Sequence, residues 1–229
     1  MSELLSCIMA TRNRRSFFQV ALRCFQRQTR PNVELVVIDD GEETVADLCE
    51  GVSNVCYVRV NRPTLLGAKL NMGIEASRGT LLQKLDDDDY YRPEFLATAA
   101  RHLPKEGDHI VAWCCFRILL AGEDRLRDSG HGWRAGGTLC FHRSLWEQHP
   151  FRSLPRAVDR WFVDDSGSRL IRVCAPEQYL LVRHGKNTWT SMQGGMDADA
   201  CLRKFPPCED LASAVDAEAL EFYKTLAPC

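Results

Sequence analysis

Apolar residues in the first hundred positions follow two alternating patterns, continuous runs and helically spaced repeats. A continuous run rich in branched residues predicts a buried strand, whereas apolar residues three or four positions apart predict an amphipathic helix. The predicted strands occupy residues 4–10, 33–39, 55–60 and 80–86. The predicted helices occupy residues 14–28, 44–51, 65–79 and 93–103, with Gly51 and Gly79 as stop signals and Pro93 in a first turn.

The second half of the chain is less regular. It contains a run typical of one or two strands, a Gly pair before a strand and a short helix, a helical segment, two strands around Pro176, a loop, and an amphipathic C-terminal helix. These segments occupy, in that order, residues 109–122, 134–151, 158–170, 171–185, 186–200 and 205–229. The whole pattern predicts one α/β domain with a mostly parallel central sheet, helices on both faces, and a smaller mixed sheet in the C-terminal half.

Polar residues directly follow three of the four strands predicted in the first half. The sequence reads TRN after the first strand, DDG after the second and DDDD after the fourth. Mostly parallel sheets bind ligands beyond the carboxyl ends of their strands. We therefore expect the three polar clusters to lie at one edge of the sheet, around a ligand.

The four consecutive aspartates at residues 86–89 concentrate negative charge at the end of a buried strand. Two carboxylates about 4 Å apart repel by roughly 1 kcal/mol in water, and by several times more at a lower effective dielectric. A solvated turn is one interpretation of this run. A divalent cation is the other, because Mg²⁺ and Mn²⁺ take one or two carboxylates and fill an octahedron with water and phosphate oxygens.

Composition narrows the class of protein. The 229 residues are 45% hydrophobic and 26% charged, which is enough for one substantial core. The formal net charge is −2, so the chain lacks the excess of basic residues that favours binding to nucleic acid or to an anionic membrane. The N-terminal apolar run is too short for a signal peptide, and no run approaches the roughly 18–20 apolar residues of a membrane span. We expect a cytoplasmic protein that contacts a membrane only peripherally, through its substrate; its oligomeric state stays open.

The eleven cysteines follow no metal-binding or disulfide pattern that the sequence reveals. None forms C-x-x-C; Cys114 and Cys115 are adjacent, and the others are scattered singly. A zinc site needs clustered spacing, and a disulfide framework needs an oxidising compartment. The cysteines are therefore interpreted mostly as small buried apolar residues, with some exposed thiols near the C-terminus.

Six segments appear in an order that resembles a known family. They read SCIMATRNR, ELVVIDDG, LLGAKLNMGIEASRGTLLQKLDDDDYYRPEFL, AGGTLCFHRSLWE, VDRWF and LLVRHGKNTW. Together, over residues 4–192, they resemble family-two glycosyltransferases of the Rossmann-like GT-A fold. The resemblance implies a nucleotide-binding half over residues 1–103 and an acceptor or catalytic half over residues 104–195.

The same resemblance implies the chemistry. The expected reaction is inverting transfer of one sugar, of the hexosyltransferase type, from a nucleotide-diphosphate sugar to an acceptor hydroxyl. A UDP-sugar is the expected donor, with GDP- and dTDP-sugars as alternatives, and Mn²⁺ or Mg²⁺ is the expected metal. The acceptor would be a saccharide or a lipid-linked glycan in polysaccharide or surface glycan assembly.

Residues of the nucleotide and metal sites can be carried over onto matching positions. Residues that match the nucleotide and donor-sugar pocket are Thr11, Asn13, Arg14, Lys69, Asp86, Asp87 and Gly137, together with Asp39 or Asp40 for the N3–H of the base. Asp88 would bind the metal, although four aspartates leave the D-x-D register open by one residue. His184 would be a second metal ligand. A simple tight turn is the alternative interpretation of Gly136 and Gly137.

Transfer also needs a general base, since the acceptor hydroxyl must lose its proton. The family places this Asp in an ED-like motif at the start of a helix, which matches Asp159. Val158 stands where the family has Glu, so Asp164 and Asp165 stay as rivals.

Aromatic and imidazole side chains offer weaker signals. Trp146 and Trp161 are expected in the core, Trp189 is a candidate for the acceptor site, and His131 is expected to be merely exposed.

Other enzyme classes fit less well. The chain has neither the G-x-G-x-x-G turn of a dinucleotide-binding enzyme after its first strand nor a P-loop. The alternative from a different class is a nucleotide-sugar-binding or scaffold protein of the same fold that has lost turnover.

Overall fold

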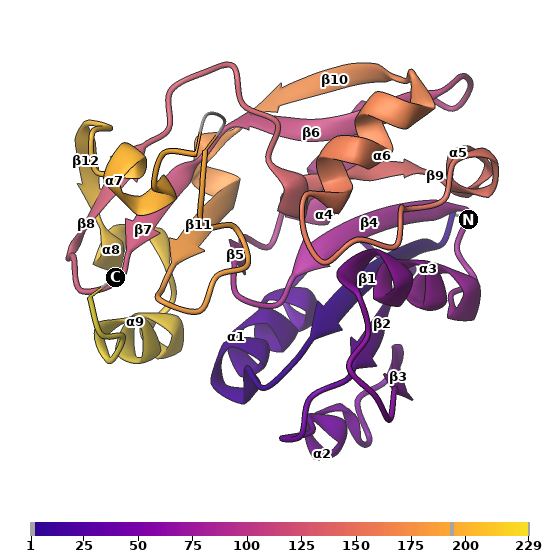
Figure 1. Ribbon diagram of the computed structural model, residues 1–229, viewed down its shortest axis with the longest axis horizontal. Helices are drawn as coiled ribbons and strands as arrows, with labels where there is room; N and C mark the ends of the chain where they lie inside the picture. The colour runs from indigo at the N-terminus through magenta and orange to yellow at the C-terminus, as the bar shows by residue number, and fades with distance from the viewer. Residues whose placement is uncertain (1–2, 193–194, 229) are drawn as a thin grey trace.

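Two β-sheets organise the computed structural model, which describes residues 3–192 and 195–228. The larger sheet has seven strands in the order β10-β6-β9-β4-β1-β2-β3 (Figure 1). Its strands are β1 (Leu5–Thr11), β2 (Val33–Asp39), β3 (Val55–Arg59), β4 (Leu81–Asp86), β6 (His109–Cys115), β9 (Cys140–His142) and β10 (Arg169–Cys174). Only β9 runs antiparallel to its two neighbours. The prediction of a mostly parallel central sheet is confirmed.

Helices cover both faces of this sheet, because successive strand residues point to opposite faces. Along β2, Leu35 and Val37 belong to the larger core cluster, whereas Val36 and Ile38 belong to the smaller one. Helices α1 (Arg15–Gln26) and α4 (Phe95–His102) pack on the larger cluster. Helices α3 (Leu66–Ala76), α5 (Arg143–Gln148) and α6 (Val158–Ser166) pack on the smaller one. The short α2 (Ala46–Cys49) precedes β3.

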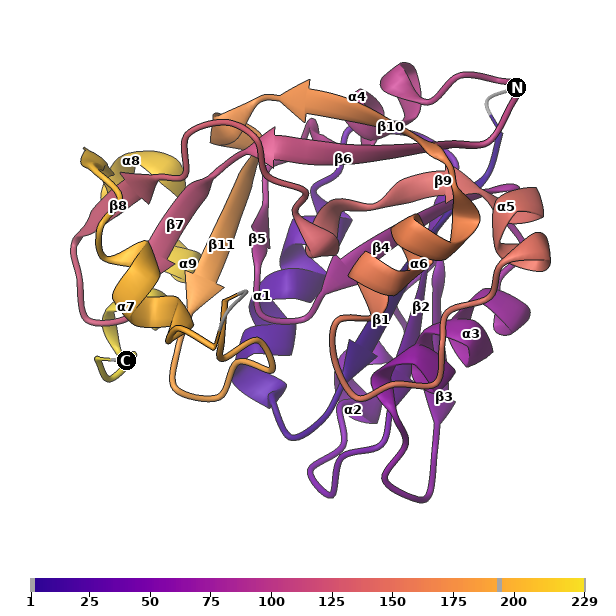
Figure 2. The same cartoon turned by 45° about the horizontal axis from the view of Figure 1, so that its top comes forward.

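The second sheet lies beside the first and has five strands, in the order β12-β8-β7-β11-β5 (Figure 2). Its strands are β5 (Tyr90–Tyr91), β7 (Arg117–Leu120), β8 (Arg125–Asp128), β11 (Tyr179–Arg183) and β12 (Pro207–Asp210). It contains parallel and antiparallel pairs, as predicted for a smaller mixed sheet. The run at 109–122 forms two strands, which Phe116 separates and which belong to different sheets.

The C-terminal segment differs from the predicted single helix over 205–229. It forms β12, then α8 (Leu211–Ala214) and α9 (Ala217–Lys224). The break comes at Asp216, whose carboxylate caps α9 by accepting hydrogen bonds from the N–H groups of Glu218 and Ala219. A hydrogen bond from the Tyr90 hydroxyl to the same carboxylate fixes the break against β5.

Three short helical elements complete the chain. They are α7 (Ala198–Leu202) and the 3₁₀ turns at Gly136–Thr138 and Pro176–Gln178. Helix α7 falls partly in the segment predicted as a loop, of which residues 193–194 lie outside the described part. Among residues 3–192 and 195–228, no helix combines the length and hydropathy that a bilayer crossing requires.

Candidate active site

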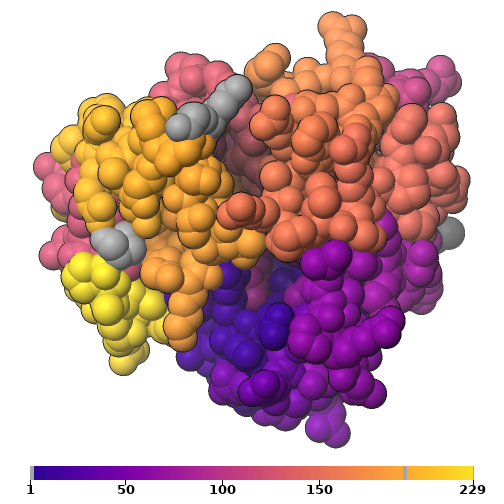
Figure 3. Space-filling model, in the orientation of Figure 1, coloured from indigo at the N-terminus to yellow at the C-terminus, as the bar shows by residue number. Residues whose placement is uncertain are grey.

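The three polar clusters lie at one edge of the larger sheet, as predicted. Strand β1 lies between β2 and β4, and its end pairs Ala10 with Asp86 and Thr11 with Asp39. The Thr11 hydroxyl donates a hydrogen bond to Asp87 at 2.7 Å, which links the first and fourth strand ends. The face drawn in Figure 3 is hollowed near its centre, between the indigo N-terminal part and the orange segments of the second half.

Within the run of four aspartates, burial alternates. Asp87 and Asp89 are buried, whereas Asp86 and Asp88 are only half-buried. The Asp87 carboxylate accepts hydrogen bonds from Thr11 and Arg14. The Asp89 carboxylate accepts hydrogen bonds from the Tyr179 hydroxyl at 2.5 Å and from the Val182 N–H at 3.0 Å. Asp86 and Asp88 are therefore the two residues of the run that stay partly exposed at the edge of the sheet.

Burial and charge divide the four carboxyls further. Burial, opposed by the charge of Arg14 and reinforced by Asp88, raises the pKa of Asp87 to about 6. Burial, together with the charges of Asp88 and Asp86, raises the pKa of Asp89 well above its usual range. Burial also acts to raise the pKa of Asp88, but the hydrogen bond to His184 and the charge of Arg14 outweigh it and lower that pKa. Asp88 is the member of the run that best keeps its negative charge.

Asp88 and His184 come together although they follow strands of different sheets. The Nε2 atom of His184 is 3.1 Å from Oδ2 of Asp88, and the Nδ2 atom of Asn187 is 3.3 Å from the same oxygen. The His184 ring stacks on Phe17 of α1, with ring centroids 4.1 Å apart. Packing thus fixes an imidazole beside the carboxylate, in the arrangement expected of two ligands of one cation.

Arg14 supplies positive charge to the same cluster. Its Nη1 atom lies 2.9 Å from Asp87 and 2.7 Å from Asp88. Its Nη2 atom donates a hydrogen bond to the Lys186 carbonyl at 2.5 Å, in the loop that carries His184. Arg14 therefore holds the acidic run and this loop together.

Asp86 lies against the Gly136–Thr138 turn, where a side chain at residue 137 would meet its carboxylate. A Cβ atom on Gly137 would lie 2.7 Å from Asp86 Oδ2 and 3.1 Å from Asp89 Oδ2, closer than ordinary contact. The Tyr91 hydroxyl accepts a hydrogen bond from the Asp86 N–H and donates one to the Gly137 carbonyl. This close approach makes Gly137 more than a generic tight-turn glycine.

Asp159 lies in the first turn of α6, next to the other glycine of this turn. A Cβ atom on Gly136 would overlap the Asp159 carboxylate, so this side chain also packs directly on the glycine pair. Asp159 is half-buried, and within the described part of the chain no Lys or Arg forms an ion pair with it. Val158, where a Glu would be expected, is fully buried in the smaller core cluster.

The two rivals of Asp159 are paired elsewhere. Asp164 forms ion pairs with Arg134 at 3.2 Å and with Arg160 at 3.5 Å. Asp165 forms an ion pair with Arg152 at 2.6 Å. This pairing favours Asp159 for the acid–base role.

The residues expected around the base of the nucleotide form a separate, buried hydrogen-bond network. The Asp40 carboxylate bonds the Lys69 ammonium at 2.7 Å and the Thr64 N–H at 2.7 Å. Lys69 also donates a hydrogen bond to the Thr11 carbonyl, so its ammonium is held by the chain at the ends of β1 and β2. The Asp39 carboxylate accepts hydrogen bonds from the N–H groups of Gly41 and Val45 and from the Tyr57 hydroxyl.

Asn13 lies in the same part of the site and has a left-handed backbone conformation, with φ of 53°. Its side chain accepts a hydrogen bond from the Glu43 N–H at 3.0 Å. Gly41 packs against it so closely that a Cβ there would lie 2.6 Å from the Asn13 nitrogen. The side chains of Asp39, Asp40 and Lys69 already make hydrogen bonds within the protein. These residues therefore line the bottom of this part of the site.

Comparison with known proteins decides the family. The model of glycosyl transferase family 2 matches residues 6–167, which is more than half of the chain. The chain belongs to glycosyl transferase family 2.

Individual relatives within family 2 share little sequence identity with this chain. EpsH of Bacillus subtilis is 28% identical over 111 residues, which are 47% of this chain and 32% of EpsH. The chain thus spans about a third of the length of that curated relative.

Solved structures share the fold. Staphylococcus aureus TarS, crystallised with UDP-GlcNAc, matches with a TM-score of 0.66 at 16% identity, over 80% of this chain and 60% of TarS. A mannosyltransferase from Pyrobaculum calidifontis, in complex with GDP-Man and Mn²⁺, matches with a TM-score of 0.65 at 17% identity, over 83% and 59% of the two chains. These likenesses confirm the GT-A fold.

Sequence reasoning missed several residues of this family-2 site. Lys84 is buried on β4, and its ammonium lies 2.5 Å from Asp86. The charges of Asp86 and Asp159 raise the pKa of Lys84, although burial alone would lower it. A lysine inside the apolar run LLQKLD was the available signal. Tyr179 and Asn187 gave no such signal, because their roles arise only from the packing of the second sheet.

The tryptophans lie in different surroundings, which the helical pattern did not predict. Trp146 packs against the smaller core cluster and donates a hydrogen bond to Asn71. The prediction of a core position is wrong for Trp161, because the guanidinium groups of Arg152 and Arg160 lie over its half-buried ring. Trp189 packs beside Trp133 at the margin of the larger cluster.

Proposed function

We propose that this chain transfers a single sugar, with inversion, from a nucleotide-diphosphate sugar to an acceptor hydroxyl, and that it needs Mn²⁺ or Mg²⁺. The observation that carries the proposal is that Asp86 packs against Gly137 and Asp159 against Gly136, with Asp88 in the same acidic run as Asp86. A donor sugar lying over this glycine pair would have its diphosphate near Asp86 and Asp88 and its open face near Asp159.

The donor atoms present fit a hard divalent cation. Asp88 contributes a carboxylate that retains its charge, and His184 contributes a ring nitrogen 3.1 Å from it. The carboxylates at residues 86–89 and 159 outnumber the cations Arg14 and Lys84 that face them. A bound cation would supply electrostatic stabilisation of the charge that develops on the departing diphosphate. We propose Asp88 and His184 as its protein ligands.

The rest of the chemistry belongs to side chains of the chain. The acceptor oxygen forms a bond to the anomeric carbon as the bond from that carbon to the diphosphate breaks. Asp159 takes the proton from the acceptor hydroxyl, and the electron pair of the broken bond leaves with the nucleoside diphosphate. Among the described residues no Arg or Lys lies within ion-pair distance of Asp159, and the charge of Lys84 acts on it only from farther away, so its carboxylate is available for this role.

The nucleotide would occupy the corner formed by Thr11, Asn13, Asp39 and Asp40. TarS was solved with UDP-GlcNAc and the mannosyltransferase with GDP-Man, so neighbours of this fold hold both kinds of base. We propose a UDP-sugar as donor, and a saccharide or lipid-linked glycan as acceptor.

A donor-hydrolysis assay tests the proposed function against the alternative of an inactive binding protein. The protein is incubated with UDP-, GDP- and dTDP-sugars, with Mn²⁺ or with a chelator, and release of nucleoside diphosphate is measured. An enzyme releases nucleoside diphosphate slowly from its donor, without acceptor, only when Mn²⁺ is present. Donor binding without any release, in the presence of Mn²⁺, would support the inactive binder instead.

A further inference from the structure

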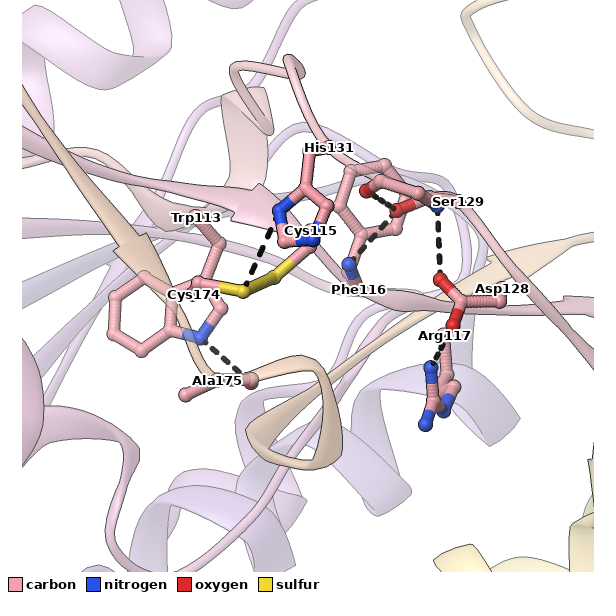
Figure 4. Close-up of a disulfide and its surroundings, with 10 residues drawn as sticks. Trp113, Cys115, Phe116, Arg117, Asp128, Ser129, His131, Cys174 and Ala175 are labelled. Carbon is pink, nitrogen blue, oxygen red and sulfur yellow. Dashed lines mark hydrogen bonds and ion pairs between the residues drawn. A yellow bond between two sulfur atoms is a disulfide. The ribbon is translucent and has the colours of Figure 1, made fainter.

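Four potential soft-metal ligands meet at the ends of β6 and β10, outside the site described above. They are the sulfur atoms of Cys114, Cys115 and Cys174 and the ring of His131. One ligand atom of each lies within 4.8 Å of all the others. The residues come from two strands and one loop, and Figure 4 shows His131 and Cys174 beside Cys115. Their sequence spacing did not predict a cluster.

An irregularity between β6 and β10 explains how two adjacent cysteines can share one cluster. Neighbouring residues of a regular strand point to opposite faces. Trp113 pairs with Val173, but the next residue of β10, Cys174, pairs with Cys115. Cys114 is thus the extra, unpaired residue of a β-bulge, which bends the strand and redirects a side chain. The bulge allows both thiols to approach Cys174.

The loop that carries His131 is fastened on both sides of this bulge. The Ser129 N–H donates a hydrogen bond to the Phe116 carbonyl, and the Trp133 N–H donates one to the Cys114 carbonyl, both at 3.1 Å. Gly130 and Gly132 flank His131 with φ of 64° and 98°. Because glycine adopts these left-handed conformations without steric cost, they let the loop turn sharply and bring the imidazole over the end of β6.

The distance between Cys174 and His131 suits tetrahedral coordination. With Zn–S near 2.3 Å and Zn–N near 2.0–2.1 Å, tetrahedral ligands stand about 3.6 Å apart for a sulfur–nitrogen pair and about 3.8 Å for two sulfurs. The Cys174 sulfur lies 3.6 Å from Nδ1 of His131. Cys114 and Cys115 are buried, whereas His131 and Cys174 are exposed, so the site opens to solvent on one side. Three thiolates and one imidazole form a ligand set typical of structural zinc.

We propose that these four residues bind one Zn²⁺ when the cysteines are reduced. In the structure Cys115 and Cys174 form a disulfide, which uses two of the four ligands. A dithiol can reduce it, giving two electrons and two protons to the two sulfurs and becoming a disulfide itself. Binding of Zn²⁺ then releases three thiol protons to solvent, and His131 binds as a neutral ring.

The site would fasten a segment that leads into the candidate active site. The chain continues from His131 through Ala135, whose N–H donates a hydrogen bond to the Trp113 carbonyl, into Gly136 and Gly137. A cation here would hold this segment to the ends of β6 and β10. The inference does not rest on the proposed function, because sulfur ligands select a different class of metal from the carboxylates of the acidic run.

Cobalt titration tests the proposal. The full chain is reduced with a dithiol, freed of it by gel filtration without oxygen, and titrated with Co²⁺. We expect saturation at one equivalent with the ultraviolet thiolate-to-cobalt band and the strong visible bands of tetrahedral Co²⁺, and their loss on addition of Zn²⁺. A Co²⁺ or Mn²⁺ ion on the acidic run cannot give a thiolate band. Absence of that band in the reduced protein would overturn the proposal, whatever the variants do.

Two variants and a control assign the ligands. Cys174→Ser and His131→Ala should weaken Co²⁺ binding by at least the roughly 10–100-fold that loss of an outer-shell partner costs. Cys56→Ser, which removes an exposed free thiol on β3, should bind like the wild type. Equal binding by Cys56→Ser and Cys174→Ser would exclude the cluster as the site. Circular dichroism of each variant checks that it is folded.

Discussion

The His184 ring nitrogen lies 3.1 Å from the Asp88 carboxylate, although 96 positions separate the two residues along the chain. Asp88 belongs to the turn after β4 in the larger sheet, and His184 follows β11 in the smaller one. The contact therefore depends on how the two sheets meet. It brings a ring nitrogen and a carboxylate oxygen together only in the folded chain.

Removal of the Asp88 carboxylate should abolish cation-dependent donor binding. Asp88→Ala takes away the member of the acidic run that keeps its charge, so affinity for the donor in Mn²⁺ should fall by more than about tenfold, or 1.4 kcal/mol. Isothermal titration calorimetry measures this affinity. Asp108→Ala, at an exposed aspartate near the start of β6, is the matched control and should bind normally. Undiminished donor binding by Asp88→Ala would place the cation elsewhere.

Replacement of Asp159 by Asn should separate binding from transfer. The amide keeps the shape of the side chain but cannot accept the acceptor proton, so the transfer rate should fall by about 10²–10⁴-fold with donor affinity unchanged. Sugar transfer to acceptor and calorimetric donor titration provide the two readouts. Asp165→Asn, whose parent carboxylate pairs with Arg152, should transfer normally. The reverse result would move the role to Asp165.

A methyl group at residue 137 should disturb donor binding through Asp86. In Gly137→Ala the new Cβ would lie 2.7 Å from Asp86 Oδ2, so the carboxylate or the turn must shift. A shift of about 1 Å in the groups that position a substrate can lower the rate roughly 10²-fold. Gly185→Ala is the control, since a Cβ at that position meets no atom within 4 Å. Equal turnover by the two variants would show that the glycine pair does not shape the donor site.

Stability should depend on pH through Glu34, at the opposite end of β2 from the site. Its carboxylate accepts hydrogen bonds from Ser6 and from the Arg78 N–H and Nε. Burial acts to raise the pKa of Glu34, but these bonds and the charge of Arg78 outweigh it and lower that pKa. A lowered pKa gives stability that is present above the unfolded-state pKa, near 4.3, and is lost as pH falls through the folded-state pKa.

Glu34→Gln tests this dependence. Hydrogen bonds to a charged group contribute about 1.5–3 kcal/mol, so the variant should lose roughly that much stability at pH 7 and progressively less below pH 4. Urea unfolding at several pH values measures the difference. Glu75→Gln, at an exposed glutamate of α3, should match the wild type throughout. A loss for Glu34→Gln that is the same at pH 3 and pH 7 would contradict the ionised state of this carboxylate.

Local patterns predicted most of the fold, because strand and helix periods differ and both are visible in short windows. The strand over residues 33–39 was predicted to the residue. The C-terminal helix was predicted as one element because apolar spacing continues across Asp216. The break depends on a hydrogen bond from Tyr90, which is 126 positions away, and no local pattern reports such a contact.

The sequence predicted what kind of site to expect, but only the packing of the folded chain shows how its residues are arranged. Sequence placed the acidic run at the sheet edge but left its register open, because adjacent aspartates look alike. Tyr179 and Val182 engage Asp89, which favours the register of Asp86 and Asp88 that we propose. The cysteine cluster escaped prediction for a similar reason, since a bulge at Cys114 is invisible in residue spacing.

Calorimetric titration of nucleotide sugars into the wild-type protein, with Mn²⁺ and with a chelator, tests the central claim most directly. We expect one UDP-sugar to bind saturably in Mn²⁺ and to lose this binding when the cation is removed. Equal binding of the donor in both conditions, or no binding of any nucleotide sugar in Mn²⁺, would contradict a cation-dependent donor site.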